Sequence, residues 1–156
     1  MRRDYFELEV ENVDWLEAGD EPAKPTVHID FHGPEELLRE RLTSPDGEPL
    51  EASETDVTFR LHDDRSESDA TGVVAVTNRL TGDFVLELNE RASDVLTFIR
   101  AAREYGESDD GDGRYRVHIS IDDERVVSYD KRTFLVYDAE GNLLRQDSLI
   151  PSGVEL

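Results

Sequence analysis

Apolar and polar residues alternate along several stretches of the chain, beginning close to the N-terminus. In residues 4–11, Phe6, Leu8 and Val10 alternate with glutamates, as expected for a strand that buries one face. The same alternation predicts further strands, and the last two of them are expected to pair as a hairpin around residues 138–142. The other predicted strands cover residues 26–32, 56–62, 72–78, 83–88, 115–121, 126–129, 133–137 and 143–149.

Two segments follow the spacing of a helix instead. The first is a short helix that opens at Pro34 with glutamates in its first turn and ends before Pro45. The second covers residues 94–105, with Ser93 as its expected cap and Gly106 just past its end. About nine strands and two helices predict an α+β fold with a mostly antiparallel sheet or sandwich.

The length fits a single globular domain, because 156 residues is an ordinary size for one core. We find neither a repeat nor a linker, so the domain is expected to cover residues 1–156. Acidic stretches near residues 63–70 and 107–113 are predicted to be flexible loops. The chain has no cysteine, which excludes disulfides and thiolate chemistry.

Charge changes this picture more than any other property of the composition. There are 38 acidic and 17 basic residues, giving a net charge of −21, and the acids are spread along the whole chain. Such a pattern is typical of halophilic proteins, because molar salt shortens the Debye length to about 3 Å and isolates each carboxylate. We predict a salt-adapted fold surrounded by monovalent cations, although an ordinary acidic protein would look similar. The charge opposes binding to nucleic acid and to anionic membranes.

The N-terminal sequence MRRDYFELEV lacks the apolar segment of a secretion signal, and no apolar run is long enough to cross a membrane. A cytoplasmic location is therefore expected. The opening MRRDYFELEVENVDW and the ending KRTFLVYDAEGNLLRQDSLIPSGVEL resemble a small acidic haloarchaeal protein family of unknown function. This resemblance covers nearly the whole chain and implies the same salt-adapted, cytosolic setting. It implies no catalytic motif.

The strongest candidate for chemistry is a row of side chains on the second predicted strand. His28, Asp30 and His32 are spaced two residues apart, so they share one face of that strand. His62 and His118 are also predicted on polar strand faces, and these five residues form a possible divalent-metal site if their strands are neighbours. The alternative is that they are ordinary polar residues on an exposed face of the sheet.

Three carboxylates on the first strand, Glu7, Glu9 and Glu11, are a second candidate, since they could share a cation or simply belong to the acidic surface. Signatures of nucleophilic, phosphate-binding and dinucleotide-binding sites are missing, so no catalytic residue and no cofactor beyond a possible divalent metal is predicted. The apolar residues Trp15 and Leu149 lie near expected loops or ends and suggest self-association or a protein partner. We therefore expect a non-catalytic module that binds a partner or itself, with a metal-binding protein or metal-dependent enzyme as the alternative.

Overall fold

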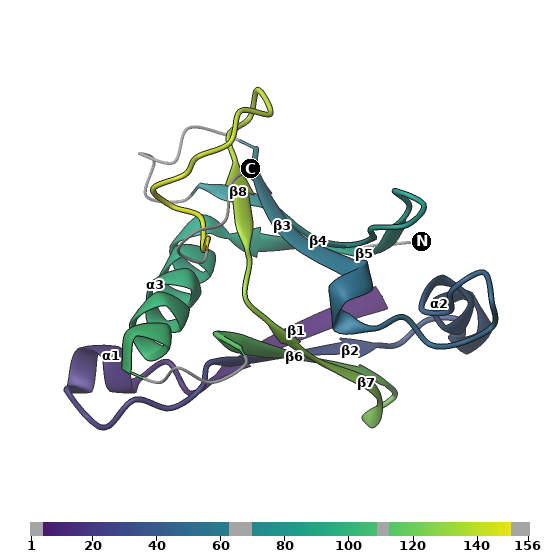
Figure 1. Cartoon of the computed structure of the whole chain (residues 1–156), viewed down its shortest axis with the longest axis horizontal. Helices are drawn as coiled ribbons and strands as arrows, with labels where there is room; N and C mark the ends of the chain where they lie inside the picture. Colours follow the sequence, from purple (N-terminus) through teal and green to yellow (C-terminus); the bar gives the residue numbers. More distant parts are fainter. Residues whose placement is uncertain (1–4, 63–69, 109–112, 151–156) are drawn as a thin grey trace.

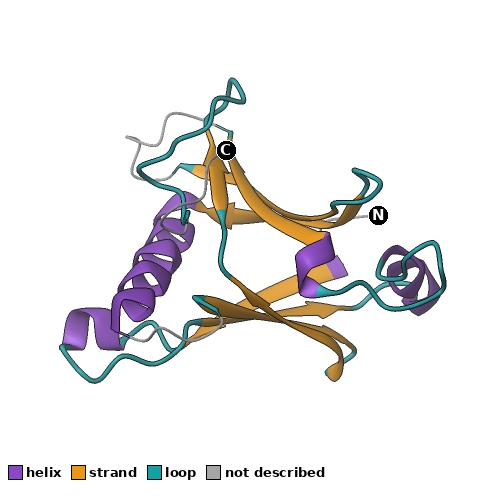
Figure 2. Cartoon of the chain, in the orientation of Figure 1, coloured by secondary structure: helices purple, strands orange, loops and turns teal. Residues whose placement is uncertain are grey.

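The computed structural model describes residues 5–62, 70–108 and 113–150, and these residues form two four-stranded sheets (Figures 1 and 2). In the first sheet the order is β1-β2-β6-β7, with β2 and β6 parallel and the other pairs antiparallel. In the second sheet the order is β5-β4-β3-β8, with β3 and β8 parallel. The strands are β1 (Phe6–Glu11), β2 (Thr26–Phe31), β3 (Thr55–Leu61), β4 (Thr71–Asn78), β5 (Phe84–Arg91), β6 (Tyr115–Ile121), β7 (Glu124–Lys131) and β8 (Leu135–Tyr137).

Helices lie at the sides of this pair of sheets. The longest, α3 (Ala92–Ser108), runs beside both sheets and closes one side of the space between them (Figure 1). The short α2 (Glu35–Arg41) lies at the opposite side, and α1 (Trp15–Ala18) and the 3₁₀ turn η2 (Ala52–Glu54) occupy connections. No helix among the described residues is long and apolar enough to cross a membrane.

The core lies between the two sheets and is built from the apolar positions that alternate along the strands. Phe31 and Ile119 of the first sheet are completely buried, as are Phe59 and Val136 of the second. From α3, Phe98 packs edge-on against the ring of Tyr115, with ring centroids 5.4 Å apart. The predicted α+β class with mostly antiparallel sheets is therefore confirmed.

The described residues contain eight strands rather than about nine, because residues 143–149 form no strand. This segment meets β8 and its flank only at two bridges, Tyr137 with Leu143 and Phe134 with Leu149. Between them the chain turns, and the hydroxyl of Ser148 accepts the hydrogen bond of the Val136 amide, which a neighbouring strand would otherwise receive. A side chain thus replaces part of the expected ladder.

Other differences are smaller. Ser93, the predicted cap, lies inside the first turn of α3, which begins at Ala92. Residues 107 and 108, expected in a loop, are the last of that helix. Most of the two predicted flexible loops, at 63–69 and 109–112, lies outside the described residues.

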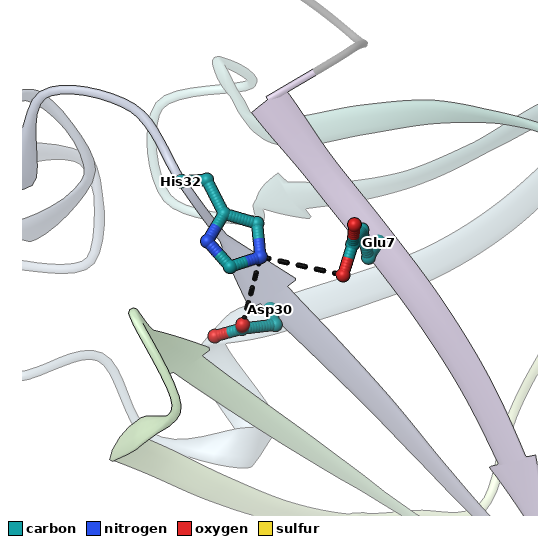
Figure 3. A group of neighbouring side chains, drawn as sticks. All are labelled: Glu7, Asp30 and His32. Carbon is teal, nitrogen blue, oxygen red and sulfur yellow. Dashed lines mark hydrogen bonds and ion pairs between the residues drawn. The ribbon is translucent and has the colours of Figure 1, made fainter.

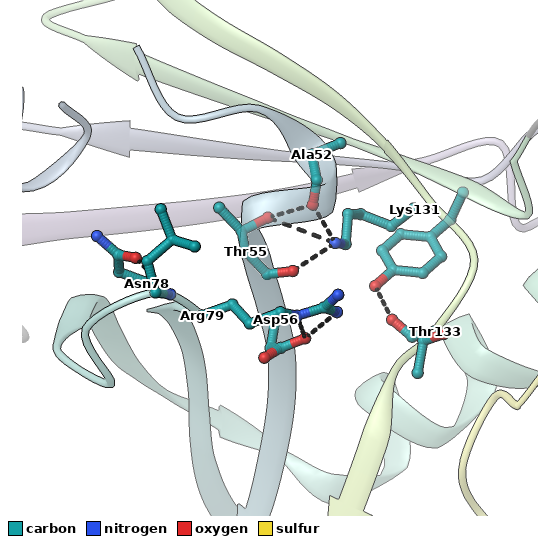
Figure 4. A network of polar contacts seen from close by, with 9 residues as sticks. Ala52, Thr55, Asp56, Asn78, Arg79, Lys131 and Thr133 are labelled. Carbon is teal, nitrogen blue, oxygen red and sulfur yellow. Dashed lines mark hydrogen bonds and ion pairs between the residues drawn. The ribbon is translucent and has the colours of Figure 1, made fainter. Parts of the chain in front are cut away.

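A buried lysine links the two sheets through hydrogen bonds. The ammonium of Lys131, at the end of β7, donates to the carbonyl oxygens of Ala52 and Thr55, both at 2.6 Å (Figure 4). Only 7% of Lys131 is exposed, and burial lowers its pKa to about 8. Nearby, Arg79 forms an ion pair with Asp56 at 2.5 Å. The first sheet is thus tied by one side chain to the start of β3 in the second.

Candidate functional site

The outer face of the first sheet is polar, and the strand register places its side chains in rows. One row runs from Glu9 on β1 through His28 on β2 to His118 on β6. The next pairs Glu7 on β1 with Asp30 on β2. Because cross-strand partners lie about 5 Å apart, each row brings side chains from different strands into contact. The candidate metal-binding side chains on this face therefore come from several strands and not from β2 alone.

Glu7, Asp30 and His32, which we call the His32 cluster, bring one imidazole and two carboxylates together (Figure 3). The Nε2 atom of His32 lies 2.9 Å from Oδ2 of Asp30 and 3.4 Å from Oε2 of Glu7. The three ligand atoms lie within 4.8 Å of one another. Among the residues that the structure describes, this is the one group of three or more acidic or histidine side chains with the spacing to hold a metal ion.

Two residues of the turn between β6 and β7, Asp122 and Asp123, form contacts with His32 and Asp30 of the cluster. The carboxylate of Asp122 lies 3.2 Å from Nδ1 of His32, and the amide of Asp123 donates to Oδ1 of Asp30 at 3.0 Å. Both turn residues have positive φ angles, 49° and 67°, a conformation that a two-residue hairpin needs but that glycine or asparagine adopts more readily. Aspartate at both positions thus combines backbone strain with contacts to the cluster, a combination found more often at functional sites.

Electrostatics favour a positive charge at the imidazole. The hydrogen bond to Asp122, together with the charges of Asp30 and Glu7, raises the pKa of His32. If Asp122 accepts the proton on Nδ1, the opposite nitrogen points at the two carboxylates of the cluster. That nitrogen can then hold either a second proton or a metal ion, since both satisfy the same lone pair.

His28 and His118 lie side by side in the neighbouring row but are arranged differently. Their rings are 4.9 Å apart and tilted by 36°. Nε2 of His28 lies 3.3 Å from a carboxylate oxygen of Glu11, at an angle that makes no hydrogen bond, and Nδ1 of His118 has no partner either. Burial, followed by nearby positive groups including Arg125, lowers the pKa of His118. This pair is a stacked contact with unused nitrogen atoms, not a set of converging ligands.

The five residues predicted from the sequence therefore separate into three places. Asp30 and His32 meet in the His32 cluster, and His28 and His118 form the stacked pair. His62 follows β3 in the second sheet, where its Nδ1 lies 3.2 Å from the hydroxyl of Thr71. The strand spacing thus identified Asp30 and His32 together, whereas the histidines as a set do not gather around one centre.

The sequence does not assign two residues, Glu7 and Asp122, to this site. Glu7 is predicted only as part of a row of carboxylates, because the alternation does not reveal that β1 lies next to β2. Asp122 was not recognised as a site residue. The sequence does contain a signal for Asp122: two consecutive aspartates, Asp122 and Asp123, lie between β6 and β7. A two-residue hairpin turn usually contains glycine or asparagine, so a pair of aspartates there indicates a further role.

Fold and site together define an α+β domain with a polar, carboxylate- and histidine-bearing sheet face. The chain belongs to DUF5793, a family of unknown function, which matches residues 1–156. Searches of curated proteins and of solved structures returned no match.

Proposed function

We propose that this protein is a divalent-cation-binding domain whose ligands are Glu7, Asp30 and His32. The observation that carries the proposal is the imidazole with one nitrogen next to Asp122 and the other facing two carboxylates. Metal-binding histidines in proteins usually donate their second N–H to such a carboxylate, which fixes the ring and the tautomer. One nitrogen and two oxygens suit zinc, manganese and related ions.

The site supports binding more directly than catalysis. Three ligands leave coordination positions for water, and Glu7 and His32 are exposed, so a cation can enter from solvent. Without a metal, a proton on Nε2 holds the two carboxylates together. A metal ion must displace that proton, so affinity is expected to increase as the pH rises through the raised pKa of His32.

Titration with Zn²⁺ or Mn²⁺ tests the proposal directly. Calorimetry is expected to show one ion per chain, with His32 ring NMR signals shifting at stoichiometric metal. His32→Ala is expected to lose binding, because it removes the nitrogen ligand. Asp122→Asn is expected to weaken binding about 10- to 100-fold, the usual effect of losing the partner that orients a ligand.

The matched control is His62→Ala, which removes an exposed histidine from the other sheet. It should bind metal as tightly as the unchanged protein. Equal loss in both variants, or no change in the His32 signals when metal is added, would contradict the proposed site.

A second candidate function is self-association through the hairpin that joins β4 and β5. Phe84 is 49% exposed and Leu80 is 59% exposed, which is unusual for large apolar side chains on one hairpin. Phe84 also lines three surface hollows, including one of about 720 Å³ next to α2. An aromatic side chain beside a hollow is a common anchor of protein interfaces, and we propose that it contacts a second copy of this chain.

Light scattering after size-exclusion chromatography, in about 3 M KCl to screen the charge, measures this association. The unchanged protein is expected to form a dimer that Phe84→Ser converts to a monomer. Val10→Ser is the control, since Val10 is 37% exposed but lies on β1 of the other sheet. A monomer at the highest attainable concentration would end this second proposal.

The setting that we propose for both functions is a salt-rich cytoplasm. The support is the net charge of −21 and the spread of carboxylates over the chain. Concentrated monovalent cations would accumulate around such a surface without occupying defined sites. Nucleic acid and anionic membranes remain unfavourable partners for the same reason.

A further inference from the structure

The outer face of the second sheet, which points away from the first sheet, contains a hollow of about 640 Å³. The strand register pairs Thr58 of β3 with Ala75 of β4, and both small side chains line the hollow. Ala75 is 4% exposed even though it lies on an outer face, because larger side chains surround it. No described helix covers this face (Figure 1).

Two aromatic side chains line this hollow from opposite edges of the sheet. Phe84 lies on β5 at one edge, and Tyr137 lies on β8 at the other. A sheet face that is exposed to water usually carries polar residues, whereas Phe84 is 49% exposed and Tyr137 is partly exposed. Aromatic side chains are enriched at protein interfaces, so this face has the composition of a contact surface.

Charge is balanced around the hollow, unlike in the chain as a whole. Among the described residues that line it, Glu87 on β5 is the one carboxylate and Arg60 on β3 is the one arginine. Arg60 donates to the carbonyl oxygen of Ala139 at 2.9 Å, and no ion pair of Arg60 is seen among the described side chains. A second chain with a charge of −21 is repelled by an acidic surface, but not by a patch in which the charges cancel.

The positions of the aromatic and charged residues are related by a single two-fold axis. In the register, Arg60 pairs with Tyr137, whereas Phe84 and Glu87 lie on β5, on the far side of β4. An axis in the plane of this face, over the middle of β4, can place Arg60 on Glu87 of a second copy. With strands about 4.8 Å apart and alternate residues about 6.8 Å apart, the same axis brings Phe84 over Tyr137 of that copy. Each contact then occurs twice, as a symmetric interface requires.

We propose that the outer face of the second sheet is the contact surface of a symmetric dimer of this chain. Arg60 of each copy binds Glu87 of the other, and the ring of Phe84 packs on Tyr137 of the other copy. This inference rests on the self-association proposed above, and it assigns the surface and the arrangement of the two copies. The His32 cluster lies on the outer face of the first sheet, so it remains accessible in both copies.

Exchanging the two charges tests this arrangement. Arg60→Glu and Glu87→Arg are each expected to weaken the dimer by at least about 10-fold, because each brings like charges together twice. The double variant with both substitutions should restore the affinity to within a few-fold. Sedimentation equilibrium in about 1 M KCl gives the dissociation constant, and there the Debye length of about 3 Å leaves only charges in direct contact to interact. Arg100→Glu is the matched control, since Arg100 is an exposed arginine on α3.

The aromatic contact is tested separately. Tyr137→Ser is expected to weaken the dimer about as strongly as Phe84→Ser, because each variant removes one half of the contact. Leu80→Ser is the control: Leu80 is on the same hairpin as Phe84 and is 59% exposed, but it does not line the hollow. It should leave the dissociation constant unchanged.

The possible outcomes distinguish this arrangement from self-association in general. A monomer in the unchanged protein would overturn both. A dimer that Phe84→Ser breaks, but that both charge variants and Tyr137→Ser leave intact, would retain self-association and overturn the proposed surface. That result is expected if β5, an edge strand, pairs with β5 of the second copy instead. A double charge variant that dimerises no more tightly than either single variant would overturn the pairing of Arg60 with Glu87.

Discussion

The thermal midpoint of this protein is expected to rise by about 10 °C or more when KCl is increased from about 0.1 M to about 3 M. The accessible surface is 8967 Å², so 38 carboxylates lie about 15 Å apart on average. At that distance two charges in water repel by about 0.3 kcal/mol without salt, and about a fifth of this remains at 0.1 M. Each carboxylate has many neighbours, so the repulsion over the folded surface reaches several kcal/mol.

The unfolded chain holds the same charges farther apart, so salt stabilises the folded state more than the unfolded one. Each kcal/mol corresponds to roughly 2–4 °C for a chain of this size. Arginine and lysine neutralise only part of the surface. Described ion pairs include Arg39 with Glu35 and Arg116 with Asp130, both largely exposed, and such pairs contribute little. The repulsion among the surface carboxylates is therefore reduced mainly by dissolved salt and not by ion pairs.

A variant with fewer charges separates this electrostatic effect from the general action of concentrated salt on proteins. Glu21→Gln, Glu48→Gln and Glu140→Gln together remove three exposed carboxylates for which no ion pair is seen among the described residues. Differential scanning calorimetry should show a higher midpoint in low salt and a smaller increase with KCl. A midpoint that stays constant with KCl in the unchanged protein would disprove the salt-adapted fold.

Local structure could be predicted because it depends on neighbouring residues. The alternation in β6 predicted that its apolar side chains are buried, although His118 on the polar face is buried as well. Pro34 with two glutamates predicted α2. The division into two sheets could not be predicted in the same way. It depends on the parallel pairing of β2 with β6 and of β3 with β8, which joins segments far apart in the chain. Alternation indicates which face of a strand is buried, but not its neighbour.

The candidate site shows the same limit. Asp30 and His32 were predicted to share a face because both lie on one segment with a two-residue period. Glu7 joins them only through the pairing of β1 with β2, and Asp122 only because the β6–β7 turn ends beside His32. His62 was grouped with the other histidines by residue type, but its strand belongs to the second sheet. Chemical type selects candidates, whereas strand order decides which of them meet.

Between pH 8 and pH 10 the stability of this protein is expected to increase, which is unusual above neutral pH. The cause is Lys131, whose pKa is lowered from its usual 10.5 to about 8 by burial in the folded protein. Within this range the unfolded lysine is still protonated while the folded one has lost its proton. Stability rises with pH wherever the unfolded state binds more protons, and the full shift corresponds to about 3 kcal/mol at most.

Two buried tyrosines limit this increase at its upper end. Burial raises the pKa of Tyr129 to about 12 and raises that of Tyr115 well above its usual 10. For these groups the unfolded state loses its proton first, so their contribution to stability falls as the pH rises above 10. The maximum is therefore expected near pH 10, with a thermal midpoint several degrees above that at pH 7.

The chain supplies a matched control, because it contains only one other lysine. Lys24 is partly exposed and pairs with Asp130 at 2.8 Å, so Lys24→Met should keep the increase between pH 8 and pH 10. Lys131→Met should abolish it, and should lower stability near pH 10, where the folded lysine is neutral, because the carbonyl oxygen of Thr55 loses the lysine donor at a cost of about 1–3 kcal/mol. NMR of the lysine side-chain ¹³Cε signals follows the proton directly in the unchanged protein. A Lys131 signal that titrates near pH 10.5 would show that the three oxygens around the ammonium, from Ala52 and Thr55, compensate fully for its burial.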